Sequence, residues 1–67
     1  MIEITLNGDK ITVDEPATIR DLFARLGLTD LRGVAVEVNE TFIEDDQYSA
    51  PLKNGAVVEI VRFVGGG

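Results

Sequence analysis

The sequence of 67 residues contains neither cysteine nor histidine, which leaves a chain of this length few ways to become stable. A domain this small buries only about 60% of the surface that its unfolded chain exposes. Small domains often compensate with disulfides or a structural zinc ion, and both need the missing residue types. The hydrophobic fraction is 45%, typical of a folded domain. We therefore expect one domain that is stabilised by its hydrophobic core, with no metal site.

The same two absences limit the chemistry that the chain can perform by itself. Histidine is the usual general base near neutral pH, and cysteine is the usual thiol nucleophile. The only sulfur encoded in the sequence belongs to Met1. We therefore expect the chain to enter a reaction as a substrate, carrier or partner of an enzyme, and not as the catalyst.

The charge balance is acidic and narrows the range of partners. Six Lys and Arg stand against twelve Asp and Glu, which gives a formal net charge of −6. Nucleic acids and anionic membranes attract basic surfaces, so neither is an expected partner. A basic protein surface would suit this charge, although solubility alone explains it equally well.

The sequence shows no signal for export or membrane insertion. Residues 1–4 lack the basic region and the following apolar stretch of a signal peptide. No apolar run approaches the roughly 20 residues of a membrane-spanning helix. We expect a cytoplasmic protein that is monomeric when free.

The pattern first predicts a β-hairpin. Residues 2–6 alternate between apolar and polar, which is the period of a strand with one buried face. Asn7-Gly8 follows and suits the positive φ angles of a tight hairpin turn. Residues 10–13 then return as a second strand.

A short amphipathic helix of about nine residues comes next. Thr18 is a good N-cap, and Asp21 can complete a variant of the capping box. Gly27 stands where a glycine commonly ends a helix. The apolar residues follow the spacing i, i+3, i+4 and i+7, which predicts one stripe packed against a sheet. This stripe consists of Ile19, Leu22, Phe23 and Leu26.

Three further strands are predicted at residues 34–38, 41–43 and 57–64, the last being the longest. Residues 44–50 are polar and are expected to be irregular, anchored by Tyr48. The helix falls between the second and third strands, so it must cover one face of the sheet. This order predicts an α+β, ubiquitin-like β-grasp fold, with a four- to five-stranded mixed sheet and one packed helix.

The last strand runs directly into three glycines. Residues 1–64 are therefore interpreted as the β-grasp body, and Gly65, Gly66 and Gly67 as a flexible tail. Such a tail reaches about 10 Å beyond the strand, at about 3.3 Å per extended residue. A frayed terminus or an expression scar is the alternative. Because the glycines directly follow the final strand of a β-grasp body, a functional tail is favoured.

The ending of the chain resembles that of the ThiS family, the ubiquitin-like sulfur carriers of thiamin biosynthesis. The resemblance rests on the Asn54-Gly55 turn, the strand at 58–64 and the glycine terminus. It extends over the whole chain, including its length, its element order and the turn at 38–40. Many carriers end in two glycines and this chain ends in three, so either Gly66 or Gly67 could be the mature terminus.

The resemblance implies a definite chemistry for the terminus. An E1-like enzyme would use ATP to adenylate the carboxylate of Gly67, and a persulfide donor would convert it into a thiocarboxylate. Thiazole synthase would then take that sulfur into the thiazole ring. The chain itself would bind no cofactor, because the activating enzyme consumes the ATP.

Strand alternation also predicts a surface for partner docking. Val58 and Ile60 should face the core, which places Val61 and Phe63 on the outward face beside the tail. An exposed apolar strip at this place is a candidate docking patch for the activating enzyme. Alternatively, Phe63 folds against its own sheet or pairs in a dimer.

Three other functions remain open at this point. The small subunit of molybdopterin synthase and a protein modifier would share the fold, the tail and the activation step. A β-grasp module without a covalent role would make the glycines incidental. The sequence identifies neither the sulfur donor nor the final acceptor.

Overall fold

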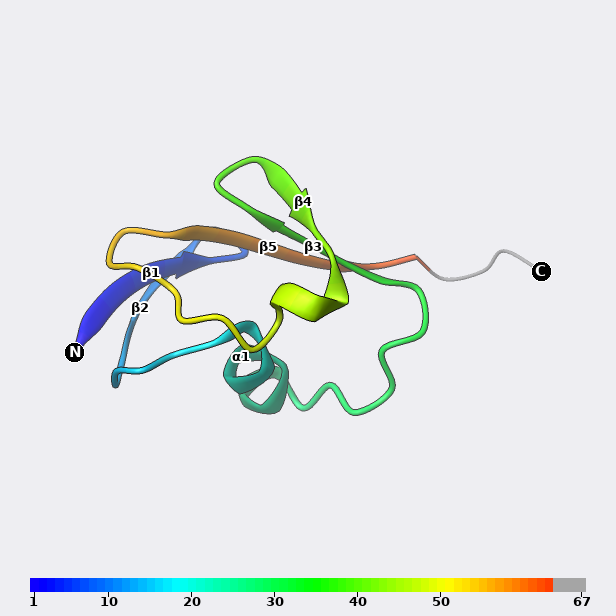
Figure 1. The fold of residues 1–67 in the computed structure, drawn as a ribbon, viewed down its shortest axis with the longest axis horizontal. Helices are drawn as coiled ribbons and strands as arrows, with labels where there is room; N and C mark the ends of the chain where they lie inside the picture. Colours follow the sequence, from blue (N-terminus) through cyan, green and yellow to red (C-terminus); the bar gives the residue numbers. More distant parts are fainter. Residues whose placement is uncertain (64–67) are drawn as a thin grey trace.

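The last strand of the chain lies in the middle of a five-stranded sheet. The computed structural model describes residues 1–63. Its elements are β1 (Ile2–Leu6), β2 (Asp9–Val13), α1 (Ile19–Leu26), β3 (Val34–Val38), β4 (Thr41–Ile43), the 3-10 helix η1 (Asp45–Gln47) and β5 (Val57–Arg62). The strand order is β2-β1-β5-β3-β4. β5 runs parallel to β1 and antiparallel to β3, so the sheet is mixed, and α1 lies on one side of it (Figure 1).

This arrangement confirms the predicted α+β, ubiquitin-like β-grasp fold with one packed helix. Some details differ from the prediction, and β2 begins one residue earlier than expected. β5 ends at Arg62 instead of residue 64, although the Phe63 N–H still donates to the Gly33 carbonyl at 2.8 Å. Residues 44–50 contain η1 where an irregular segment was expected. The predicted boundary between a body at 1–64 and a tail at 65–67 falls outside the described residues.

The hairpin and the helix form for the local reasons that the sequence predicts. Asn7 and Gly8 have φ angles of 49° and 88°. Positive φ at both positions is what a tight two-residue hairpin turn requires. Thr18 accepts a hydrogen bond from the Asp21 N–H, and the Asp21 carboxylate accepts one from the Thr18 N–H in return. Gly27, at φ 73°, ends the helix in the left-handed conformation.

The core lies between α1 and the inner face of the sheet. Ile4 and Val58 are completely buried, and Leu22 packs against this cluster. Tyr48 is buried as predicted, with its ring 5.2 Å from the Phe23 ring in an edge-to-face arrangement. The remaining buried residues are Ile2, Leu6, Ala17, Ile19, Val36, Ala56 and Ile60.

The prediction that Leu26 packs against the sheet is wrong. Its side chain remains 43% exposed, whereas Leu22 and Phe23 on the same helix are 1% and 4% exposed. The buried residues of α1 all lie in its first five positions. Only this part of the helix therefore contributes to the core.

Asparagine side chains extend the hydrogen bonding of β5 beyond its strand partners. β1 pairs with β5 at two positions. Past the end of β1, the Ile60 N–H donates to Asn7 Oδ1 at 2.8 Å, and Asn7 Nδ2 donates to the Ile60 carbonyl at 3.3 Å. At the start of β5, the Val57 N–H donates to Asn39 Oδ1 at 2.9 Å. These asparagine side chains therefore supply hydrogen bonds to β5 that the backbone of a neighbouring strand does not supply there.

Replacing Phe23 tests the placement of the helix. We expect Phe23→Ala to lower the free energy of unfolding by about 3–5 kcal/mol, because it leaves a cavity beside Tyr48. Leu26→Ala should cost far less, since much of that side chain is already in water. Urea unfolding of both variants measures the difference, and equal losses would contradict the assigned packing face.

Replacing Asn7 tests the amide pairing with β5. Glycine keeps the positive φ angle, so Asn7→Gly removes mainly the two hydrogen bonds to Ile60. We expect a loss of about 1–3 kcal/mol, because the partly buried Ile60 groups lose their partner. Glu40→Gly is the control, since Glu40 also has a positive φ of 69°. It should be close to neutral in the same unfolding experiment, and a neutral Asn7→Gly would mean that water replaces the amide.

Candidate functional site

The candidate site is the end of β5, where the chain leaves the sheet. The predicted reactive residues Gly65, Gly66 and Gly67 lie outside the described residues, so they remain predictions. The two predicted docking residues are described, and both are exposed: Val61 by 43% and Phe63 by 68%. In Figure 1 this end of β5 lies far from the N-terminus.

Val61 and Phe63 lie on the face of the sheet that α1 leaves open. Val58 and Ile60 point to the core and are buried, so the alternation along β5 places the odd-numbered residues outward. Ala35 of β3 is the direct partner of Val61 on this open face. The exposure of Phe63 contradicts the alternative that its ring folds against its own sheet.

The open face also carries two acidic side chains, and sequence reasoning missed that they oppose each other directly. Glu37 of β3 and Glu59 of β5 are direct cross-strand partners, and Phe42 of β4 lies opposite Glu37 on its other side. Within residues 1–63, neither glutamate forms an ion pair. Like charges at directly opposed positions weaken a sheet. Phe42 is 65% exposed, so this row of the open face has an apolar group on β4 beside the two acidic groups on β3 and β5.

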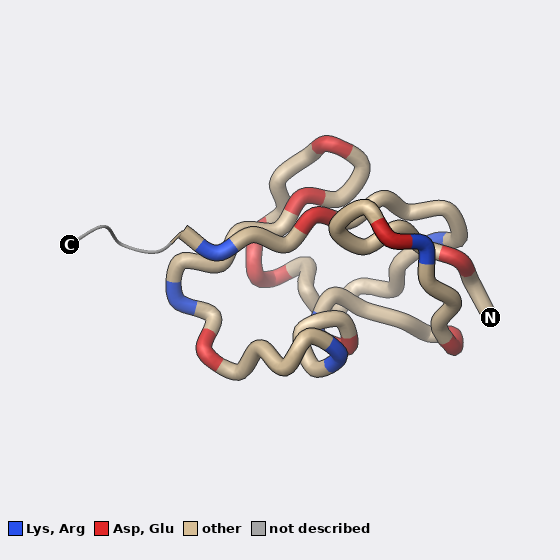
Figure 2. Tube along the Cα trace, turned by 180° about the vertical axis from the view of Figure 1, so that it is seen from behind, with Lys and Arg blue, Asp and Glu red and all other residues tan. Residues whose placement is uncertain are grey.

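The loop at residues 30–33, here called the exit loop, contacts the end of β5. The Arg62 guanidinium donates a hydrogen bond to the Asp30 carbonyl, and the Phe63 N–H donates to the Gly33 carbonyl. Arg32 forms a two-pronged ion pair with the Asp30 carboxylate, with its closest contact at 2.7 Å. Figure 2 shows basic segments on both the loop and the end of β5, with an acidic segment beside them.

The ion pair between Asp30 and Arg32 shifts the pKa values of both residues. Hydrogen bonds from the Arg32 side chain and N–H lower the pKa of the Asp30 carboxyl, and the Arg62 charge lowers it further. The Asp30 carboxylate correspondingly raises the pKa of Arg32. Both groups are therefore charged at neutral pH. Asp30 favours the folded state above its unfolded pKa, and this contribution is lost as the pH falls through its lowered folded value.

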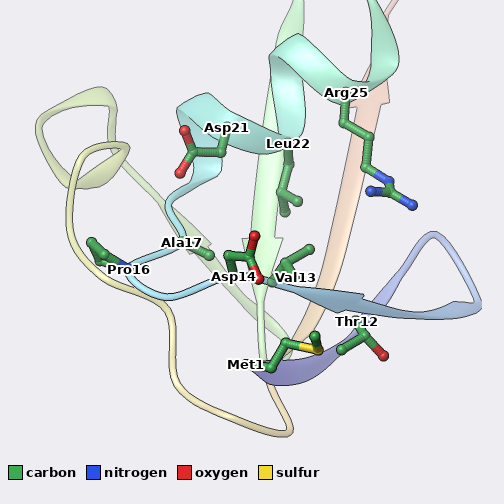
Figure 3. A pocket seen from close by; sticks show the side chains of 9 residues that line it. All are labelled: Met1, Thr12, Val13, Asp14, Pro16, Ala17, Asp21, Leu22 and Arg25. Atoms are coloured by element: carbon green, nitrogen blue, oxygen red, sulfur yellow. The ribbon is translucent and has the colours of Figure 1, made fainter.

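An open pocket lies elsewhere, between α1, β2 and the segment that joins them (Figure 3). Leu22 points into it from the helix, towards Val13. The Asp21 carboxylate at its rim already accepts hydrogen bonds from Thr18 and caps the helix. Met1 also lines this pocket, which places it away from the end of β5. This pocket therefore does not bring together the predicted site residues.

The described residues show neither a metal cluster nor a membrane-spanning helix. No group of three or more acidic side chains within residues 1–63 is arranged to hold a metal ion. The one α-helix in this part of the chain has eight residues, which is too short to cross a membrane.

Comparison with known proteins identifies relatives over nearly the full chain. A sequence model of the ThiS family matches residues 2–67. The sulfur carrier protein ThiS of Thermus thermophilus is 35% identical over 65 residues, covering 96% of this chain and 98% of that protein.

Two solved structures from Geobacter metallireducens have the same fold. The crystal structure of its thiamine biosynthesis protein ThiS superposes with a TM-score of 0.75 at 32% identity, covering 98% of this chain and all of that one. An NMR structure of a thiamine biosynthesis protein from the same organism gives 0.74 at 33% identity, covering 98% and 88%. The sequence match and the shared β-grasp fold agree, and the chain belongs to the ThiS family of sulfur carrier proteins.

Proposed function

We propose that this carrier holds its sulfur as a thiocarboxylate on Gly67 and donates it to the synthesis of the thiazole ring of thiamin. The observation that carries the proposal is the full-length match to a sulfur carrier, in a chain that ends in glycines. The names of the Geobacter relatives favour thiamin over the molybdopterin pathway.

The proposed chemistry needs two activation steps and one cleavage. A Gly67 carboxylate oxygen attacks the α-phosphorus of ATP, and pyrophosphate leaves. The terminal sulfur of a persulfide then attacks the acyl carbon, and AMP leaves, which gives an acyl disulfide. A thiol cleaves the sulfur–sulfur bond, so that the thiocarboxylate is released and a disulfide forms between the two thiols.

The carrier supplies the carboxyl group and a docking surface, and its enzymes supply the catalysis. These would be an E1-like adenylating enzyme, a persulfide donor and thiazole synthase. Glycine suits the terminus because a chain without Cβ atoms can pass through a narrow channel to the nucleotide. Since the sequence has no cysteine, it offers no second thiol for the sulfur to reach.

We assign the docking of the activating enzyme to the open face around Val61 and Phe63. Both side chains are exposed beside the start of the glycine segment, so a partner that covers them also receives the terminus. The opposed pair Glu37 and Glu59 favours a partner surface with Lys or Arg between apolar groups. Such a cation would relieve the repulsion between the two carboxylates and match the net charge of −6.

Changing the length of the terminus tests the reactive position. Deleting Gly67 shortens the reach by about 3.3 Å, and appending Ala after Gly67 moves the carboxylate outward and adds a Cβ. We expect ATP–pyrophosphate exchange with the activating enzyme to fall about 100-fold in both variants, because the attacking oxygen is misplaced. Their thermal midpoints should match that of the full chain, since the core residues lie between 2 and 60.

Each other outcome of this experiment has a definite meaning. Equal exchange in all three chains would contradict the proposal that the terminal carboxylate reacts. Exchange only in the shortened chain would make Gly66 the reactive terminus.

Replacing Phe63 tests the docking surface. Phe63→Asp puts a charge where the partner would exclude water, so we expect binding to weaken at least tenfold in calorimetry. The free protein should keep its stability, because the side chain is largely exposed. Phe42→Asp on the same face measures how far the surface extends towards β4. Unchanged affinity of Phe63→Asp would place docking elsewhere.

The intact mass of the carrier from its native host separates the remaining functions. Replacement of one oxygen by sulfur supports a carrier, whereas an isopeptide-linked adduct would identify a protein modifier. Release of the sulfur to thiazole synthase in a reconstituted reaction distinguishes the thiazole pathway from molybdopterin synthesis. An unmodified terminus that the enzyme does not activate would favour a non-covalent binding module.

A further inference from the structure

Gly33 and Phe63 approach each other so closely that only glycine fits at position 33. A Cβ built on Gly33 would lie 2.6 Å from the Phe63 carbonyl oxygen, which is shorter than any normal contact. The two residues also share a backbone hydrogen bond, from the Phe63 N–H to the Gly33 carbonyl at 2.8 Å. The obstructing atom belongs to the backbone, so a rotamer change cannot relieve the clash.

This restriction distinguishes Gly33 from the other described glycines with positive φ. Gly8, Gly27 and Gly55 have no atom within 4 Å of an added Cβ, so their backbone conformation alone explains glycine. Gly33 and Gly27 share the same φ of 73°. The additional requirement for glycine at position 33 is therefore steric. The space that a Cβ would need is occupied by the backbone of Phe63, close to the glycine terminus.

Other contacts between the exit loop and β5 also hold the end of the strand in place. The Arg62 guanidinium binds the Asp30 carbonyl, and the Asp30 carboxylate is itself held by Arg32. The Leu31 carbonyl accepts a hydrogen bond from the Val34 N–H, which closes the loop onto the start of β3. The end of β5 is thus held on this side by backbone and side-chain contacts together.

We propose that Gly33 is a positioning residue for activation of the terminus, because it lets the exit loop fix Phe63 in place. The inference rests on the proposed function of Gly67 as the reacting residue. Four residues separate a fixed Phe63 from that carboxylate, a span of at most about 13 Å. Losing the anchor moves the fixed point back along β5 and lengthens the tether. The position of the carboxylate is then less closely defined by the fold, and its effective concentration at the nucleotide falls.

Gly33→Ala with Gly27→Ala as its control tests this role. Both variants place alanine at the same unfavourable φ, so both should lose some thermal stability. Only Gly33→Ala forces the exit loop and Phe63 apart. Measurements at a temperature where both variants are fully folded remove the stability loss from the comparison.

The first measurement is hydrogen exchange of the Phe63 amide, which needs no partner enzyme. We expect exchange at least tenfold faster in Gly33→Ala, and within twofold of the unmodified chain in Gly27→Ala. Equal Phe63 exchange in all three chains would overturn the anchor.

The second measurement is ATP–pyrophosphate exchange with the activating enzyme, with the carrier as the varied substrate. We expect kcat to fall at least tenfold in Gly33→Ala with KM changed less than threefold, and both constants to stay within twofold in Gly27→Ala. A kcat equal to that of Gly27→Ala would overturn the positioning role. A rise in KM alone would also overturn it, because that result assigns Gly33 to docking.

The two measurements separate this inference from the proposed function. If the unmodified carrier supports no exchange of pyrophosphate, the proposed function fails and positioning fails with it. If the unmodified carrier is active and Gly33→Ala matches Gly27→Ala, only the inference fails.

Discussion

The pairing of β5 with both β1 and β3 is the interaction on which the rest of the structure depends. β5 joins the N-terminal hairpin to the β3–β4 half of the sheet and supplies Val58 and Ile60 to the core. The chain has no disulfide to replace this connection. The same strand carries the exposed residues beside the glycine terminus on its other face. The core contacts and the proposed docking surface therefore share one strand, on opposite faces of its pleat.

Those features that depend on neighbours along the chain could be predicted from the sequence. The Asn7-Gly8 turn, the capping box of Thr18 and the left-handed Gly27 are all local, and the structure contains each of them. The outward direction of Phe63 follows from strand alternation, and its exposure agrees. The limit of this reasoning appears at Leu26. Helical periodicity gives a direction for this side chain but does not show how far the core extends beneath it.

The features that the sequence did not reveal depend on residues far apart in the chain. Asn7 was predicted as a turn residue only, because its partner Ile60 lies 53 positions away. The spatial requirement at Gly33 involves Phe63, and the opposition of Glu37 and Glu59 follows from the register of β3 and β5. A glutamate in each of two predicted strands and a glycine just before a strand are visible in the sequence. Neither could be interpreted before the pairing was known.

The parallel pairing of the first and last strands has a consequence for how the protein is made. Contacts between residues so distant in sequence form late and slowly, because a long segment must close before they form. A nascent chain that ends before β5 lacks both the centre of its sheet and a large part of its core. We expect such a fragment to stay unfolded, so the chain acquires its ordered structure only once its last strand has been made.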